Sequence, residues 1–361
     1  MTRANGTGPV LHDGTLTFSY PDPDRSLARV RLVHEREIAI PGLPLDFAPA
    51  SSSSSWRLRL PRPSVDRMEY LLEVEDATGD TRLVCDPTNP LRAPGPFGDK
   101  SVVEFPGYHR PSWLGNGAAP AGVVVPFTRS SRSLRDRVDG LFWSSPGSTP
   151  EDRLPLLIAH DGPEYAQYSA LIRLLEAMTG EGRLPPMRAA LLAPGLRDRH
   201  YSASPRYARA LCRDVIPWLT ELAPTRGGRE MRIGMGTSLG ALALLHAHRF
   251  DPRSFGGLFL QSGSFFRPST TEQVWDFTRG RRIVRFVGEV LGAREWQDPI
   301  PITMTCGRLE KNLANNRALR DALGAQGYEP ELHDTRDLHN WVAWRDAFDP
   351  HLVALLQRAW A

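Results

Sequence analysis

The pattern of apolar and polar positions divides the chain into two regions of different character. The first third holds short alternating, β-branched or aromatic runs separated by proline, glycine and serine, a pattern typical of β-strands. The expected strands are Thr15–Tyr20, Ala28–His34, Trp56–Leu60, Met68–Glu75 and Thr81–Cys85. Short strands at this spacing predict a β-sandwich.

Beyond residue 122, apolar strands alternate with segments of helical periodicity. The expected strands are Val123–Phe127, Val138–Trp143, Leu154–Ala159, Ala189–Ala193, Met231–Met235, Gly257–Gln261, Ile302–Cys306 and Glu331–Asp334. The expected helices are Tyr165–Met178, a helix that Ser204 caps and that runs toward Leu222, and Asn312–Leu323. This alternation predicts an α/β domain with a mainly parallel sheet and helices on both of its faces.

A segment rich in glycine, alanine and proline lies between the two regions. We therefore predict a β-sandwich domain over residues 1–113, a linker over residues 114–122 and an α/β domain over residues 123–361.

Composition narrows the classes of function. The chain has 361 residues, of which 41% are hydrophobic and 24% charged, as in ordinary globular proteins. A formal charge of only +3 predicts no nucleic-acid partner. The sequence shows neither an apolar run of membrane-spanning length nor an apolar signal segment at its start, so no membrane partner is expected. The three cysteines, Cys85, Cys212 and Cys306, fit neither a disulfide framework nor a metal site, which predicts a reducing, cytoplasmic location.

Ser238 is the candidate nucleophile. It is the centre of Gly236-Thr237-Ser238-Leu239-Gly240, with an apolar run before the pentapeptide and a helix-forming run after it. A strand, a sharp turn and a helix are the context that a G-x-S-x-G nucleophile elbow requires. The alternative is a glycine-rich turn with a surface serine.

A serine nucleophile needs a base and an acid, which in this arrangement follow it along the chain. His339 is the candidate base, because it lies in a loop between the expected last strand and a helix. Glu310 is the candidate acid, three residues after Gly307 at the end of the expected strand Ile302–Cys306. Asp337 is the second choice for the acid.

An oxyanion hole needs two backbone N–H groups. The residue after the nucleophile, Leu239, is expected to supply one of them. The loop after Leu154–Ala159 is expected to supply the other, from Gly162 or Glu164, because Pro163 has no N–H.

Taken together, these motifs resemble the enterochelin (enterobactin) esterases, a branch of the α/β-hydrolases that also holds feruloyl esterases. The resemblance rests on Asp161-Gly162, on Arg197 to Ser202 with His200 at the position of an acid, on Ser238, on Gln261 to Phe266, on Gly307 to Asn316, on His339 with Trp341 and Trp344-Arg345, and on Asp86 to Pro90 in the first region. It implies an α/β-hydrolase domain preceded by an all-β, immunoglobulin-like sandwich domain. Where the family often has aspartate after the histidine, this chain has Asn340.

The resemblance also implies a substrate, a catecholate trilactone siderophore whose ester bonds are hydrolysed through an acyl-enzyme. No cofactor is expected, no metal site is assigned, and iron would arrive with the substrate. Such a polyanion would be attracted by arginine side chains, and these candidates join Trp341 as substrate-binding residues: Arg197, Arg199, Arg267, Arg281, Arg282, Arg285 and Arg345. Arg279 to Arg285 lie in a long insertion after Phe266, where such hydrolases place their lid, and a solvated helix face is the alternative interpretation of this segment. The rival functions are an esterase or acyltransferase for another natural product or for feruloyl or acetyl esters, and a catalytically inert carbohydrate-binding protein. The oligomeric state is not encoded in these patterns.

Overall fold

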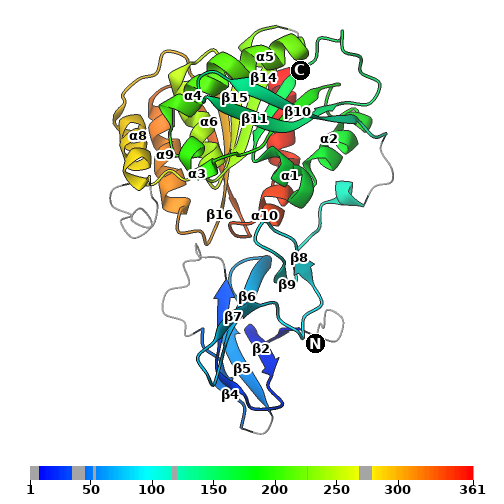
Figure 1. Ribbon diagram of the computed structural model, residues 1–361, viewed down its shortest axis with the longest axis vertical. Coiled ribbons are helices and arrows are strands. Elements are labelled where there is room, and N and C mark those ends of the chain that lie inside the picture. The colour runs from blue at the N-terminus through cyan, green and yellow to red at the C-terminus, as the bar shows by residue number, and fades with distance from the viewer. Residues whose placement is uncertain are drawn as a thin grey trace. The chain divides into compact units, whose positions relative to one another are not determined.

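The computed structural model describes residues 8–34, 45–51, 54–115, 120–225, 227–267 and 279–360. Contacts divide the chain into two compact units (Figure 1). The first comprises Met1–His109, Gly307–Lys311 and Arg336–Asn340, and the second comprises Arg110–Cys306, Asn312–Thr335 and Trp341–Ala361. Two short loops from late in the sequence therefore belong to the same unit as the amino-terminal strands.

The first unit contains two antiparallel sheets. One has the strand order β1-β2-β5-β4 and is formed by Val10–His12, Thr15–Pro21, Ser55–Pro61 and Ala48–Pro49. The other has the order β3-β6-β9-β8 with β7 paired to β6, and is formed by Leu27–His34, Arg67–Asp76, Lys100–Glu104, Arg92–Ala93 and Thr81–Val84. The five strands expected from the sequence correspond to β2, β3, β5, β6 and β7.

The core of this unit follows from the alternation along its strands. Leu16 and Phe18 of β2 are buried with Leu72 of β6, because every second side chain of a strand points to the same face. Leu338, from the second of the late loops, is 1% exposed in the same cluster. The loop is thus anchored by hydrophobic burial.

The second unit is built on one sheet with the order β10-β11-β13-β12-β14-β15-β16-β17. Its strands are Val123–Ser131, Asp136–Ser144, Arg188–Leu192, Leu156–His160, Arg232–Thr237, Gly257–Gln261, Pro301–Gly307 and Glu329–Thr335, in that spatial order. β13, β12, β14, β15 and β16 are parallel, whereas β10 and β11 form an antiparallel hairpin at one edge. This is the α/β fold expected from the alternating pattern.

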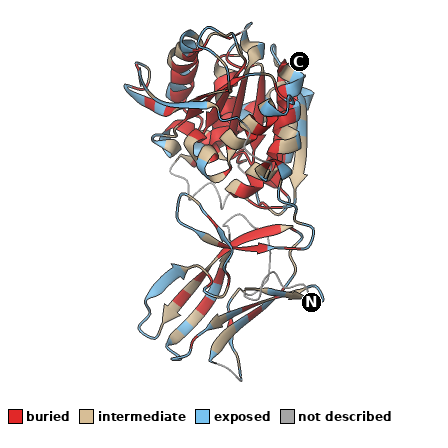
Figure 2. Cartoon of the chain, turned by 90° about the vertical axis from the view of Figure 1, so that its right-hand side faces the viewer, coloured by how far each residue is buried: buried red, intermediate tan, exposed pale blue. Residues whose placement is uncertain are grey.

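Helices cover both faces of this sheet (Figure 1). One face carries α3 (Arg197–Tyr201), α4 (Pro205–Ala210), α5 (Ile216–Leu222), α6 (Leu239–Phe250), α8 (Gly280–Gly292) and α9 (Leu313–Ala325). The other carries α1 (Gly162–Tyr168), α2 (Leu171–Gly180), α10 (Trp341–Asp346) and α11 (Val353–Trp360). Burial is concentrated in the strands between these layers (Figure 2). Continuous apolar strands are what a sheet covered on both faces requires.

The expected helix Tyr165–Met178 is interrupted. Ala170 adopts φ 51°, in the left-handed region, so α1 and α2 are separate helices. Apolar periodicity did not reveal this break. The helix capped by Ser204 does continue to Leu222, as α4, a π-helical turn at Leu211–Val215 and α5.

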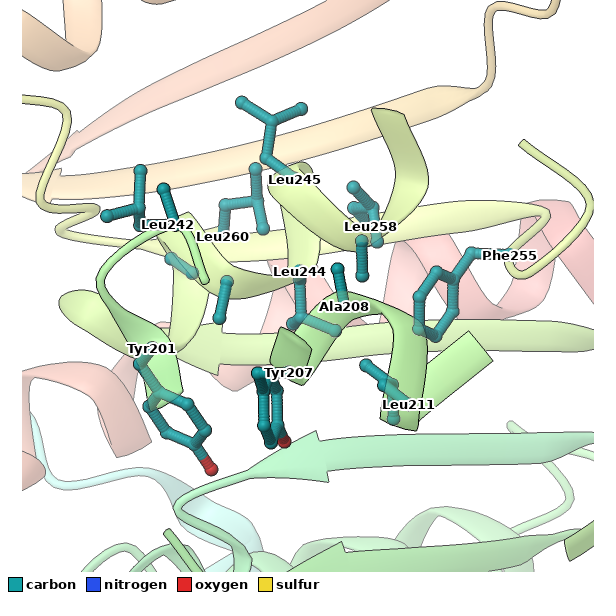
Figure 3. Packing of buried hydrophobic residues seen from close by; sticks show 14 of the residues in the cluster. Tyr201, Tyr207, Ala208, Leu211, Leu242, Leu244, Leu245, Phe255, Leu258 and Leu260 are labelled. Carbon is teal, nitrogen blue, oxygen red and sulfur yellow. The ribbon is translucent and has the colours of Figure 1, made fainter. Parts of the chain in front are cut away.

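α6 is the buried helix at the centre of the second unit. Leu242, Leu244 and Leu245 belong to one buried apolar cluster with Tyr207 and Leu211, and Leu244 is the one on the side of those two residues (Figure 3). No helix in the described ranges is long and apolar enough to cross a membrane. Among those residues, no group of three histidine, cysteine, aspartate or glutamate side chains has the arrangement needed to hold a metal ion.

Candidate active site

Ser238 lies at the turn between β14 and α6. Its backbone has φ 54° and ψ −119°, a conformation that is rare for a residue with a side chain and that stores strain. The Ser238 N–H donates to the Gln261 carbonyl at 2.9 Å, and Ser238 is only partly buried. This geometry is that of a nucleophile elbow.

The glycines on either side of Ser238 allow the turn to close. A Cβ atom at Gly236 would lie 2.8 Å from the Gly240 carbonyl carbon, closer than real Cβ contacts. A Cβ atom at Gly240 would lie 3.1 Å from Asp161 Oδ2 and 3.2 Å from His160 Cβ. β14, α6 and the loop after β12 therefore pack together only because these two positions carry no side chain.

Ser264 is the functional candidate that the sequence analysis did not assign. Its Oγ lies 3.1 Å from the Ser238 Oγ, and its N–H donates to the Ser238 carbonyl at 3.1 Å. It is 3% exposed. The position was visible in the sequence within Gln261 to Phe266, but only the fold brings its hydroxyl to Ser238.

Asparagines of α9 hold the loop that carries Ser264. Asn316 accepts from the Gly263 N–H at 3.1 Å and donates to the Gly263 carbonyl at 3.0 Å, and Asn312 donates to the same carbonyl. Trp344 Nε1 donates to Ser262 Oγ at 3.0 Å. The three hydrogen bonds to the Gly263 backbone hold the loop that carries Ser264.

The loop after β12 begins at Asp161, which has φ 50°. Gly162 starts α1, and a Cβ atom there would lie 2.3 Å from Leu191 Cα in β13. Arg197 binds both carboxylate oxygens of Asp161, each at 2.8 Å. Burial lowers the pKa of Arg197, but the Asp161 carboxylate outweighs this effect and holds it above its usual value. Arg197 is therefore committed to shaping this loop.

His160 joins the same loop to α6. Its Nδ1 lies 3.0 Å from the Gly240 carbonyl and its Nε2 lies 3.0 Å from the Tyr207 hydroxyl. Because a carbonyl only accepts, Nδ1 donates and Nε2 accepts the tyrosine proton. Burial lowers the pKa of His160 to about 4, so the ring is neutral at pH 7. The ring therefore serves to hold the loop against α6 and α4.

His339 and Glu310 meet within the first unit. His339 Nδ1 lies 2.8 Å from Glu310 Oε2, with the glutamate side chain fully buried and the histidine side chain 17% exposed. Glu310 Oε1 accepts from the Gly307 N–H at 2.7 Å. Glu310 lies just before α9, which begins at Leu313. A carboxylate on Nδ1 leaves Nε2 as the nitrogen available for proton transfer.

Asp337 makes different contacts. Its Oδ1 accepts from the Leu338 N–H at 2.8 Å and from Asn340 Nδ2 at 3.0 Å, and its Oδ2 lies 3.8 Å from the buried Arg67. Burial raises its pKa to about 7, although Arg67 opposes the shift. Of the two acids considered, Glu310 is the one in contact with the histidine.

The arginines expected to bind substrate have varied surroundings. Arg267 Nε donates to Asn315 Oδ1 at 2.9 Å, and Arg345 Nε donates to Asp346 Oδ1 at 2.7 Å. Arg282 donates to the carbonyls of Ser202 and Arg199.

The remaining arginine candidates are on the surface. Arg199, Arg281 and Arg285 are exposed. α8 buries Ile283, Phe286, Val287 and Val290 in the core, so Arg281 and Arg285 lie on the solvated face of an amphipathic helix. The rest of the expected lid, residues 268–278, lies outside the described residues. Trp341 packs edge-on against Tyr165, with ring centroids 5.3 Å apart.

The chain is similar to one protein family, to proteins of known name and to solved structures. Residues 131–355 match the protein family described as "Putative esterase". The iron(III) enterobactin esterase of Dickeya dadantii (strain 3937) is 28% identical over 211 residues, which cover 57% of this chain and 48% of that protein. The protein of the same name from Escherichia coli O6:H1 is 26% identical over 215 residues, 57% of this chain and 52% of that protein. The matched region is thus about half of these relatives' length.

Solved structures share the fold over almost the whole chain. The enterobactin esterase of Shigella flexneri, crystallised in the presence of enterobactin, has a TM-score of 0.74 at 20% identity and covers 99% of this chain and 96% of its own. The ferric enterobactin esterase of Salmonella typhimurium has a TM-score of 0.72 at 21% identity, over 99% and 97% of the two chains. At such identities the likeness concerns the fold. Since the family match spans more than half of the sequence, the chain belongs to this esterase family and has its α/β fold.

Proposed function

We propose that the protein is a serine carboxylic-ester hydrolase. The observation that carries this proposal is the backbone of Ser238, which is held in a strained turn between β14 and α6 with a partly exposed side chain. Such strain persists only where the surrounding structure imposes it, and it is concentrated at functional sites. A surface serine in an ordinary turn would not need Gly236 and Gly240 at contact distance.

In the proposed mechanism, Ser238 Oγ attacks the ester carbonyl and His339 Nε2 takes its proton. Glu310 orients the imidazole through Nδ1 and stabilises the imidazolium, a role supported by the 2.8 Å contact. The Leu239 N–H and the Gly162 N–H hold the oxyanion, since both begin helices whose first N–H groups have no partner within the helix. His339 then returns the proton to the leaving alcohol, and water hydrolyses the acyl-enzyme.

We further propose that the substrate is a catecholate trilactone siderophore, delivered with or without its iron. The names of the relatives support this substrate class, as does the presence of arginines in the second unit. Because the Arg197 and Arg282 side chains already have protein partners, the exposed Arg199 and Arg281 are the better candidates for substrate contact.

The test is a hydrolysis assay with ferric and iron-free trilactone beside neutral p-nitrophenyl esters, at ionic strengths from about 0.1 M to 1 M. The Debye length falls from about 10 Å to about 3 Å over this range, so KM should rise with salt for the ferric catecholate and stay level for the neutral ester. Ser238→Ala serves as the blank. Turnover of the p-nitrophenyl ester alone would point to an esterase for another natural product. Absence of turnover and of fluorophosphonate labelling would remove the hydrolase proposal.

We propose in addition that residues 1–113 form an immunoglobulin-like sandwich domain, joined by residues 114–122 to a catalytic domain over residues 123–361. The two sheets β1-β2-β5-β4 and β3-β6-β9-β8, with one shared apolar cluster, support the sandwich. The cytoplasmic location stays a prediction from the sequence.

A further inference from the structure

A hollow lined by arginines lies on the second unit, at the tip of the β10–β11 hairpin. It has a volume of about 600 Å³ and is lined by Arg132, Ser133, Arg135, Pro205, Arg206 and Arg209. Four of these six residues are arginines and none is acidic. We refer to these six residues as the arginine hollow.

The hairpin side of the arginine hollow is held in place by hydrogen bonds. Asp214 accepts from Ser131 Oγ at 2.5 Å and from the Ser133 N–H at 2.8 Å. The Ser131 hydroxyl in turn accepts from the Leu134 N–H at 3.1 Å, and Leu134 is buried. Asp214 is thereby committed to the turn, and the positions from which Arg132 and Arg135 project are fixed.

The helical side is attached to the same turn. Arg206 Nε donates to the Ser133 carbonyl at 2.7 Å, and its Nη2 donates to the Leu134 carbonyl. Arg209 follows one turn later on α4 and is exposed. Among the described residues, no ion pair or side-chain hydrogen bond engages the guanidinium groups of Arg135 and Arg209. Four arginines thus lie on a turn and a helix that hydrogen bonds hold together. The guanidinium groups of Arg135 and Arg209 have no partner among the described residues.

An anion with several charged groups could contact more than one of these arginines at once. Guanidinium groups recognise phosphate and carboxylate in a bidentate manner, and fixed groups lose less conformational entropy on binding. We propose that the arginine hollow is a binding site for a compact, soluble polyanion that carries several phosphate or carboxylate groups.

The arginine hollow is separate from the catalytic serine. β10 is antiparallel to β11, β11 is antiparallel to β13, and β12 is parallel to both β13 and β14, so β10 and β14 end at the same edge of the sheet. Four strand spacings lie between them, about 19 Å at about 4.8 Å each. The turn that carries Arg132 and Arg135 therefore lies well to the side of Ser238, and the proposal holds whether or not the protein hydrolyses esters.

The experiment is calorimetric titration with tripolyphosphate and with citrate at about 0.1 M salt, where exposed charges beyond about 10 Å are screened. We expect saturable binding of at least one of the two, and the better ligand identifies the preferred group. Arg135→Ala/Arg209→Ala should weaken it about tenfold or more, because each removes charge-assisted hydrogen bonds. The control Arg153→Ala/Arg294→Ala removes the same charge from two exposed positions in the same unit and should bind as the wild type does.

Two further measurements sharpen the outcome. Turnover of a neutral p-nitrophenyl ester should be the same in the hollow variant as in the wild type, and melting temperatures should match because both residues are exposed. Vesicles containing phosphatidylglycerol should not compete for the site. Absence of saturable binding of both probes, equal losses in the two double variants, or binding to vesicles alone would overturn the proposal.

Discussion

The elbow around Ser238 and the loops that carry His339 and Glu310 are built in different ways. The elbow is made almost entirely from its own pentapeptide and the strands and helices beside it, with Gly236 and Gly240 at contact distance. The loops Gly307–Lys311 and Arg336–Asn340 leave β16 and β17, yet their contacts place them with the amino-terminal strands.

The loop contacts explain this assignment. Leu338 is buried in the core of the first unit, and Arg67 of β6 donates to Asn340 Oδ1 at 3.4 Å and lies 3.8 Å from Asp337. The Asp66 N–H donates to the Arg336 carbonyl at 2.7 Å. His339 therefore sits between two residues, Leu338 and Asn340, that the amino-terminal strands hold. The proposed nucleophile is held by local contacts, whereas the position of the proposed base depends on Arg67, which is 273 positions away from Asn340 in the sequence.

The largest effect is expected at the elbow itself. Ser238→Ala should lower kcat by about 10⁴ to 10⁶, because the triad acts as a unit. The measurement is p-nitrophenyl ester turnover together with fluorophosphonate labelling, with Ser130→Ala on the exposed face of β10 as the matched control. Retention of more than about a tenth of the activity would show that the nucleophile lies elsewhere.

The second prediction concerns the base and acid. His339→Ala should be about as damaging as Ser238→Ala, whereas Glu310→Gln should cost about 10⁴ in kcat, since the acid orients the base and forms no bond to substrate. Steady-state kinetics of both variants against pH provide the measurement. An equally severe loss in Asp337→Asn, with Glu310→Gln active, would transfer the role of the acid to Asp337.

The third prediction tests whether Ser264, which lies outside the pentapeptide, helps to position Ser238. Ser264→Ala removes the hydroxyl 3.1 Å from Ser238 Oγ and should lower kcat by up to about tenfold, the value of one neutral hydrogen bond, with KM unchanged. Ser169→Ala, at a buried hydroxyl that donates to the Trp341 carbonyl, is the control. Rescue by Ser264→Thr would support positioning, and wild-type kinetics in Ser264→Ala would exclude it.

The contrast between elbow and loops also explains what the sequence could predict. The G-x-S-x-G context and the alternation of strands and helices along the chain were enough to predict the turn at Ser238 and the α/β fold, because both follow from local spacing and periodicity. The hydrogen bond between the Ser264 and Ser238 hydroxyls joins segments that are distant in the sequence, as do the contacts of Arg67 with the His339 loop. No local sequence pattern predicts such contacts. The helix break at Ala170 could not be predicted either, because nothing in the local sequence indicates that this alanine adopts a left-handed conformation.

The smallest effect on turnover is expected at Asp337, where the pH dependence of stability tests how the His339 loop is held. Burial raises the pKa of this carboxyl to about 7 in the folded protein, against about 3.9 in an unfolded chain. Between these values the unfolded chain releases a proton that the folded protein keeps, so the free energy of unfolding falls as pH rises from about 4 to about 7. Asp337→Asn keeps the Oδ1 acceptor for Leu338 and removes the titration. The variant should therefore lose less stability than the wild type over this range, as measured by melting temperature against pH. Parallel curves for the two proteins would mean that Asp337 is already ionised in the fold and that Arg67 holds the loop as a full ion pair.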